Sequence, residues 1–391
     1  MDARIKSAHD KCSGVIMVRP IRRIVAGNDD RGIAVALSDG PSPDVRLDPA
    51  RPGFAATRLW VQETTPARAK AVRETLHLPH TIEPPPGGSI CRVVEYPPEA
   101  AYIRNVSAAA VTNYFAAMGS PGAAVADGRH PYMQRTDSID FCSILEGAIT
   151  LVLDTAEVHL KAGDQVIIRG SRHAWSNRSS KPCVVVMSQH AASPAAEVLP
   201  VQREDASERL KSSVRPLRRV VTGNDAKGRS GVLHDSATPN YFPRATGTCF
   251  YELWTLDRVP AGIAGDTDAG VAGRPFGHSP PANGAHWRIT HSPAKRVEVK
   301  SKAEQAKLDA ENSTGGTQRL EGARAEGMHR TPSVDYAVCL EGERHLVLED
   351  SDVLIGAGDV VIQLGNWHSW ENRSGVPVLM SYVMISGEFA A

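Results

Sequence analysis

Short hydrophobic runs separated by turn residues occur in two similar parts of the chain. In CSILEGAITLVLDTAEVHLKAGDQVIIRG (142–170), Gly and Asp interrupt runs of Val, Ile and Leu, and CLEGERHLVLEDSDVLIGAGDVVIQLG (339–365) repeats this pattern. Runs of roughly four to seven residues, at roughly ten-residue spacing, are typical of strands in a small antiparallel sandwich or barrel. The pattern therefore predicts an all-β protein.

Two segments depart from the strand pattern. The segment 105–119 predicts a helix, because its apolar residues recur at about helical spacing, at Val106, Val111, Phe115 and Met118. The segment 294–316 is polar and charged, and we expect a surface helix or a mobile loop there. Each segment precedes the barrel strands of its part of the chain, so each is placed to cover a barrel mouth.

The chain is internally duplicated. MQRTDSIDFCSILEG (133–147) returns as MHRTPSVDYAVCLEG (328–342), with eight of fifteen positions identical, and RPIRRIVAGNDDRG (19–32) returns as RPLRRVVTGNDAKG (215–228). The offset stays between 194 residues, from Trp60 to Trp254, and 196 residues, from Arg19 to Arg215. A constant offset between copies indicates two homologous units. We predict domains at 15–195 and 211–388, joined by a small, polar linker at 196–210.

Composition narrows the classes of partner and compartment. Lys+Arg and Asp+Glu are equal at 44 each, so the chain has no overall attraction to nucleic acid or to an acidic membrane. Its six cysteines form no CxxC pair, which favours reduced cysteines and a cytoplasmic location. The N-terminus lacks the apolar run of a signal peptide, and no stretch is long and apolar enough to span a membrane. We expect a small-molecule substrate as the partner.

Two motifs in the second unit resemble those of the cupin superfamily. The first cupin motif, H-x-H-x(3–4)-E-x(6)-G, is represented by His329, Thr331, Asp335 and Gly342. The second motif, G-x(5)-P-x-G-x(2)-H-x(3)-N, is represented by Gly358, Gly365, His368 and Asn372, without the proline. Because both units carry the pair, the resemblance implies a bicupin: two tandem double-stranded β-helix (jelly-roll) barrels with short helical insertions. Cupins commonly pair through barrel faces, which implies a homodimer.

The motif residues of the second unit predict a metal site. Alternate residues of a strand point to the same face, so His329 and Thr331 are both expected to point into the barrel. Together with Asp335 and His368 they would give two imidazoles and one carboxylate, with open positions for substrate, O2 or water. Such a set suits a divalent metal, Fe(II) foremost, with Mn, Ni or Zn as alternatives. The competing interpretation is a polar pocket without metal, in which His329 hydrogen-bonds to Asp335.

Further residues of the second unit are candidates for the pocket. Trp370 is expected to point the same way as His368, and Thr331 and Asn372 are expected to line the same pocket. Trp370 and Tyr336 are our candidate catalytic residues, although Tyr336 follows Asp335 directly and its side chain is expected to face outward. A loop-rich run found only in the second unit carries three histidines that are able to swing over the pocket, His278, His286 and His291.

The equivalent site of the first unit consists of Gln134, Asp140 and His173. A neutral carboxamide is a poor ligand for a transition metal, and one carboxylate with one imidazole rarely holds such an ion tightly. We therefore predict a degenerate site in the first unit, which keeps the fold and supplies packing or a subunit contact.

The function predicted from these features is a metal-dependent enzyme of dioxygenase type on a small organic molecule, aromatic or carboxylate in character. A metal-dependent decarboxylase, another lyase or an isomerase is the alternative within the enzymes. A metal-free binding or sensing module is the alternative outside them. Phosphate-binding glycine loops, GxSxG and HExxH motifs do not occur in the sequence, which disfavours nucleotide, serine-hydrolase and zincin chemistry.

Overall fold

The computed structural model describes residues 18–68, 73–263, 265–295, 297, 301–303, 306, 310 and 316–388. Its strands in the first unit are β1 (Arg22–Asn28), β2 (Ala34–Pro41), β3 (Asp44–Leu47), β4 (Ala55–Gln62), β5 (Ser89–Tyr96), β6 (Ser138–Glu146), β7 (Ala148–Leu153), β8 (Glu157–Lys161), β9 (Gln165–Arg169), β10 (His173–Ser176) and β11 (Cys183–Ser193). Helix α1 (Ala108–Ala117) lies inside the predicted segment 105–119, and the described residues 302, 303, 306 and 310 of the second unit are also helical.

The second unit repeats the same order of strands. They are β12 (Arg218–Asn224), β13 (Ser230–Ala237), β14 (Tyr241–Pro243), β15 (Cys249–Leu256), β16 (Ala261–Gly262), β17 (Ala285–Ser292), β18 (Gln318–Arg319), β19 (His329–Arg330), β20 (Ser333–Glu341), β21 (Glu343–Val347), β22 (Asp352–Gly356), β23 (Val360–Leu364), β24 (Ser369–Glu371) and β25 (Val378–Ser386). The predicted all-β class is confirmed. Most of segment 294–316 lies outside the described residues. No helix in the described part of the chain is long and apolar enough to cross a membrane.

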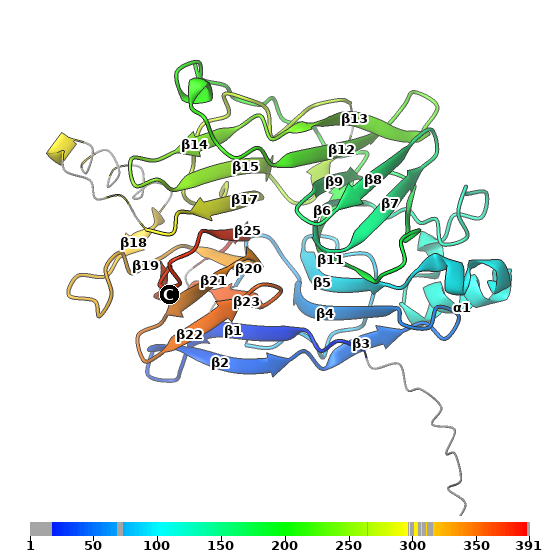
Figure 1. Ribbon diagram of the computed structural model, residues 1–391, viewed down its shortest axis with the longest axis horizontal. Coiled ribbons are helices and arrows are strands. Elements are labelled where there is room, and N and C mark those ends of the chain that lie inside the picture. The colour runs from blue at the N-terminus through cyan, green and yellow to red at the C-terminus, as the bar shows by residue number, and fades with distance from the viewer. Residues whose placement is uncertain are drawn as a thin grey trace, which may run out of the picture.

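Each unit contributes its first two strands to the large sheet of the other unit (Figure 1). Strand β1 pairs in parallel with β23, and β12 pairs in parallel with β9. The large sheets therefore have the orders β14-β15-β17-β25-β20-β23-β1-β2 and β13-β12-β9-β6-β11-β5-β4-β3. A three-stranded sheet faces each one, β22-β21-β24 in the second half and β10-β7-β8 in the first.

Equivalent arginines hold the exchanged strands in place. On β1, Arg22 donates to Asp359 at 2.8 Å, and on β12, Arg218 donates to Asp164 at 2.8 Å. Each carboxylate belongs to the half that receives the strand. The limits of the two domains stay a prediction, but the pairing shows that strands from both sides of residues 196–210 complete each barrel. From here on, "first half" and "second half" denote the barrels built on β6 and β20.

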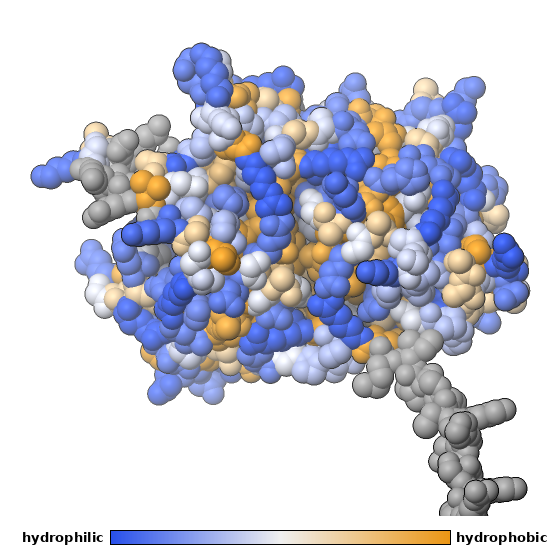
Figure 2. All heavy atoms as spheres, viewed as in Figure 1, coloured by the Kyte–Doolittle hydropathy of each residue, from blue (hydrophilic) through white to orange (hydrophobic). Residues whose placement is uncertain are grey.

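Strands β6 and β20 are buried on both faces, because one face lines a barrel and the other packs against the other half. On β20, Tyr336 belongs to an apolar cluster that spans both halves, whereas Ala337 belongs to the cluster inside the second barrel. In the spanning cluster, Phe141 of β6 stacks on Trp287 of β17 with ring centroids 5.2 Å apart. The surface in Figure 2 is mostly hydrophilic, with apolar residues in patches over the middle of the molecule.

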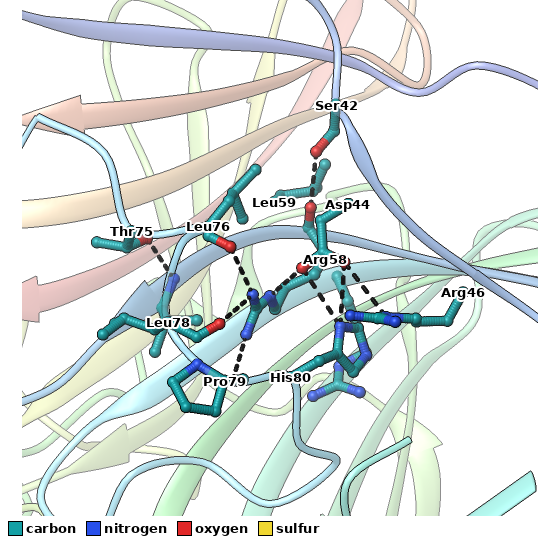
Figure 3. A network of polar contacts seen from close by, with 12 residues as sticks. Ser42, Asp44, Arg46, Arg58, Leu59, Thr75, Leu76, Leu78, Pro79 and His80 are labelled. Carbon is teal, nitrogen blue, oxygen red and sulfur yellow. Dashed lines mark hydrogen bonds and ion pairs between the residues drawn. The ribbon is translucent and has the colours of Figure 1, made fainter. Parts of the chain in front are cut away.

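A buried arginine fixes a long loop of the first half to its sheet (Figure 3). Arg58 of β4 is 1% exposed and donates to Asp44 at 2.6 Å. Its remaining N–H groups donate to the carbonyls of Leu76, Leu78 and Pro79 at 2.7–2.9 Å. A buried charge is stable in such a place because a carboxylate and hydrogen bonds satisfy it together.

Candidate functional site

A cavity of about 580 Å³ opens into the second barrel, a size typical of small-molecule sites. The predicted metal ligands and Thr331, Trp370 and Asn372 line it, whereas Tyr336 does not. These residues come from β19, β20 and β24 and from the turns beside them. The cavity lining includes Phe250, His278, Arg288, His329, Asp335, Arg344, His368, Trp370, Tyr382 and Met384.

The two motif histidines lie side by side in this cavity. The backbone N–H groups and carbonyls of His329 and His368 bond to each other at 2.9 Å in both directions, and the ring centroids are 4.5 Å apart. Nδ1 of His329 lies 2.9 Å from the Gly327 carbonyl, and Nδ1 of His368 lies 3.0 Å from the Asn366 carbonyl. A carbonyl only accepts, so we assign the proton to Nδ1 in both rings. This leaves Nε2 with a lone pair.

Both imidazoles are neutral at physiological pH. Burial lowers the pKa of His329, and burial lowers the pKa of His368 to about 3. Neutral imidazoles whose second nitrogen is held by a backbone carbonyl are the form in which histidine binds metals.

Asp335 lies on β20 and lines the same cavity. Its side chain is buried, which raises its pKa to about 7, and its Oδ1 has no hydrogen-bond partner. In the first half, the equivalent Asp140 accepts a hydrogen bond from Gln189 at 3.2 Å. Met384 stands in place of Gln189 in the second half and offers no donor. The Asp335 carboxyl is thus available to a group inside the cavity.

The predicted triad is only partly assembled. Among the residues that the structure describes, no group of three or more His, Cys, Asp or Glu side chains is placed to hold a metal ion. His329 and His368 meet, and Asp335 shares their cavity. The donor chemistry of the two imidazoles fits a divalent transition metal, while the third protein ligand stays a prediction.

The two further predicted pocket residues, Thr331 and Asn372, differ in their hydrogen bonding. Thr331 is buried, and its hydroxyl has no hydrogen-bond partner. The Asn372 amide donates to the carbonyls of Pro293 at 3.0 Å and Val376 at 2.8 Å, and its oxygen accepts from Ser374. Asn372 therefore fixes a turn at the rim of the cavity.

Tyr336 has a different environment from the one that a catalytic role requires. Its ring is 1% exposed and lies in the apolar cluster between the halves, where its hydroxyl is 2.9 Å from the Ser89 hydroxyl of β5. It does not line the cavity because it lies on the opposite face of β20 from Asp335. The position supports packing between the halves, and it does not support the catalytic role that we predicted for this residue.

His278 adds a third imidazole to the cavity. Its ring centroid lies 5.5 Å from that of His329. His278 is equivalent to Ile82 of the first half, because corresponding arginines bond to the two carbonyls. Arg92 donates to the Ile82 carbonyl, and its counterpart Arg288 lies 3.4 Å from the His278 carbonyl. The other two histidines predicted to reach the pocket, His286 and His291, lie on β17 and do not line the cavity.

In the first half, side chains satisfy one another at the equivalent site. The Gln134 amide nitrogen lies 3.2 Å from Nε2 of His173, and Nδ1 of His173 lies 2.8 Å from the Ser171 carbonyl. With its proton on Nδ1, His173 accepts at Nε2 the hydrogen bond that Gln134 donates. The lone pair that would bind a metal is therefore already used, which gives a physical reason for the difference between Gln134 and His329.

Apolar side chains fill the first barrel where the second has polar ones. Ile149 is 3% exposed and packs in the first barrel, together with Met187. Their counterparts in the second half, Arg344 and Tyr382, line the cavity. Strand pairing establishes that Ile149 and Arg344 are equivalent. Ile149 pairs with residue 160 and Arg344 pairs with residue 355, and the second pair follows the first at the constant offset between the two units. Our sequence reasoning did not select Arg344, although aligning the two units shows arginine in the place of a buried isoleucine.

These features define a two-barrel, all-β protein of the cupin class, with an open polar cavity in one barrel and a packed interior in the other. Residues 121–188 match a family model described as "Cupin domain". This part of the chain is therefore a cupin domain, and the large sheet of the second half has the corresponding strand order. The matched residues lie in the first half and include Gln134, Asp140 and His173.

Curated relatives match short stretches of the chain. Phomopsin biosynthesis cluster protein C' of Diaporthe leptostromiformis is 48% identical over 56 residues, which cover 14% of this chain and 30% of that protein. The cupin-domain-containing oxidoreductase virC of Hypocrea virens is 36% identical over 62 residues, covering 15% of this chain and 32% of that protein. The matches thus span about a third of the length of these relatives.

Solved structures resemble the chain over most of its length at low sequence identity. AerE from Microcystis aeruginosa has 10% identity and a TM-score of 0.39, with coverage of 88% of this chain and 97% of that chain. A cupin 2 conserved barrel domain protein from Leptotrichia buccalis has 9% identity and a TM-score of 0.33, with coverage of 85% and 89%.

Proposed function

We propose that the chain is a metal-dependent cupin enzyme that acts on a small organic molecule in the cavity of the second half. His329 and His368 would hold the metal, Fe(II) foremost, with Mn, Ni or Zn as alternatives. A bound ion of this kind supplies open coordination positions and Lewis acidity. The first half serves the fold.

One observation carries this proposal. Two neutral imidazoles lie with ring centroids 4.5 Å apart in a cavity, and a backbone carbonyl accepts from Nδ1 of each ring. In the part of the chain that the structure describes, no side chain donates to their Nε2 atoms as Gln134 donates to His173. Two adjacent lone pairs favour a shared electrophile in the cavity.

The chain's own residues would bind and orient the substrate. Trp370 lies against His368 with ring centroids 6.3 Å apart and against Tyr382 with centroids 5.7 Å apart, so it would wall the substrate beside the imidazoles. Asp335 shares the cavity, and burial raises its pKa to about 7. A carboxyl with such a pKa is able to hold or release a proton near neutral pH.

The relatives' names favour redox chemistry in biosynthesis. One relative is named an oxidoreductase and another a biosynthesis cluster protein. We propose an oxidoreductase of dioxygenase type first and a lyase second. A small molecule is the expected partner, and we further propose a homodimer in the cytoplasm.

Elemental analysis of protein purified without chelator tests the metal. We expect about one divalent transition metal per chain, lost from His329→Ala and from His368→Ala. The matched control is Gln134→Ala, which changes the position of the first half that is equivalent to His329. This variant should keep the metal. Titration of the apoprotein with Mn(II), Ni(II) or Zn(II) should raise the melting temperature of the wild type and not that of His329→Ala.

A metal-free binding module is the second candidate, favoured by the lack of a group of three ligating side chains among the residues described. Wild-type protein without metal, whose melting temperature added metal does not change, would select this candidate. Metal loss from Gln134→Ala, with retention in His329→Ala, would move the site to the first half. For the enzyme, oxygen uptake compared with CO2 release over aromatic and keto acids separates dioxygenase from decarboxylase.

A further inference from the structure

Arg344 of β21 brings a positive charge into the second barrel at the position where the first barrel has a buried isoleucine, Ile149. The side chain lines the cavity, and one terminal nitrogen donates to the Trp370 carbonyl at 3.1 Å. Its Nε is buried and has no hydrogen-bond partner among the described residues. A guanidinium in a barrel interior is costly unless an anion satisfies it.

Protein carboxylates do not satisfy this guanidinium. No Asp or Glu oxygen lies within 4.0 Å of Arg344 in the part of the chain that the structure describes, although two other arginines at the cavity are paired with carboxylates. Arg288 bonds to Glu252, and Arg373 bonds to Asp352 at 2.6 Å and to Glu371 at 2.6 Å. Arg344 thus differs from Arg288 and Arg373, because no carboxylate of the described residues neutralises its charge at the cavity.

Three aromatic side chains line the polar cavity together with Arg344. Its guanidinium carbon lies 5.9 Å from the centroid of the Trp370 ring, and Phe250 and Tyr382 also line the cavity. Flat walls of this kind favour a flat ring between them. The planar fork of a guanidinium matches a carboxylate in a bidentate geometry.

We infer that Arg344 binds the carboxylate of a small aromatic acid, whose ring packs against Trp370 and reaches toward His329 and His368. The inference deepens the proposed function by naming the substrate class, and it rests on that proposal for placing the substrate in this cavity. Arg344 would be the residue that selects an acid over its neutral analogue. Its counterpart Ile149 explains why the first barrel has no such role.

Calorimetric titration with benzoate and benzamide tests the selection, because the two ligands share a ring and differ in charge. We expect the wild type to bind benzoate at least tenfold more tightly than benzamide. Arg344→Gln should weaken benzoate binding about tenfold to a hundredfold, the usual range for a charged hydrogen bond, and should change benzamide binding little. The control Arg215→Gln makes the same change at an exposed arginine that pairs with Glu341, and benzoate binding should stay unchanged.

A second variant guards against a folding defect. Arg344→Ile installs the residue of the first half, so the ligand-free protein should melt at or above the wild-type temperature, while benzoate should no longer raise that temperature. Equal binding of benzoate and benzamide by the wild type, no binding of either, or an unchanged preference in Arg344→Gln would overturn the inference. Metal content is read on the same samples. A protein without metal that still loses its benzoate preference in Arg344→Gln keeps this inference and refutes the metal proposal.

Discussion

A buried carboxyl in the first half predicts how stability depends on pH. Asp140 of β6 is 2% exposed, and burial raises its pKa from 3.8 to about 6. Hydrogen bonds from Ser138 at 2.5 Å and Gln189 at 3.2 Å oppose this rise without cancelling it. The substitution Asp140→Asn keeps the shape of the side chain and removes its titration.

The sign follows from proton binding in the two states. Between pH 3.8 and about 6 the folded protein holds a proton on Asp140 that the unfolded chain has lost, so folding stability falls as pH rises through this window. The full shift corresponds to about 3 kcal/mol at 1.36 kcal/mol per pKa unit. Between pH 4.5 and pH 7 the part that is lost is about 2 kcal/mol.

Urea unfolding of the wild type and Asp140→Asn at several pH values from 4.5 to 7, followed by fluorescence and circular dichroism, measures this. The free energy of unfolding of Asp140→Asn minus that of the wild type should increase by about 2 kcal/mol from pH 4.5 to pH 7. Asp29→Asn is a control without a slope in this range, because the backbone N–H of Ile33 lowers the pKa of Asp29 from 3.8 and its titration lies below pH 4.5. Its stability relative to the wild type should stay nearly constant from pH 4.5 to pH 7.

A difference between Asp140→Asn and the wild type that stays constant from pH 4.5 to pH 7 would refute the reasoning. The same holds for a difference that decreases, since that would mean a folded-state pKa below the unfolded one. Agreement between the two spectroscopic probes is needed at each pH, because a chain with two barrels need not unfold in one step.

Three further predictions follow from the fold. Arg58→Met should lower the free energy of unfolding by about 3–5 kcal/mol, because it removes the buried partner of Asp44 and leaves three loop carbonyls without their donor, whereas the exposed Arg46→Met should have a small effect in the same urea titration. Fragments 18–195 and 211–388 produced separately should each lack a cooperative thermal transition, and mixing them should restore one, because each needs the other's exchanged strands; a cooperative transition in either fragment alone would contradict this. Gln134→His should add a second site for Ni(II) in calorimetry, because it frees Nε2 of His173; an unchanged stoichiometry would show that the first half lacks more than this one ligand.

The strand pattern in the sequence predicted the class of fold and the residues around the cavity. Val, Ile and Leu runs between turn residues are local features, so the all-β class followed without long-range information. The constant offset between copies related the two halves, and the motif spacing brought His329, Asp335 and His368 to one cavity. Alternation along β20 also indicated that Tyr336 faces away from Asp335.

Other features depend on contacts between distant segments. The sequence of β1 matches that of β12, but only the pairing of each with the other half shows that the strands are exchanged. The sequence predicted that the side chain of Tyr336 points away from the barrel interior. It did not predict the contact of this side chain with Ser89, 247 residues away. His278 comes from a loop whose path is set by a hydrogen bond of Arg288.

Which side chains share a face of a strand was predictable from the order of residues, since alternation is fixed by backbone geometry over a few residues. What each face meets became known from the packed fold: a neighbouring half for Tyr336, a packed interior for Ile149, and an open cavity for Arg344. The reason is that packing and burial come from residues far apart in the chain. The chemistry of a side chain depends on these surroundings as much as on its identity.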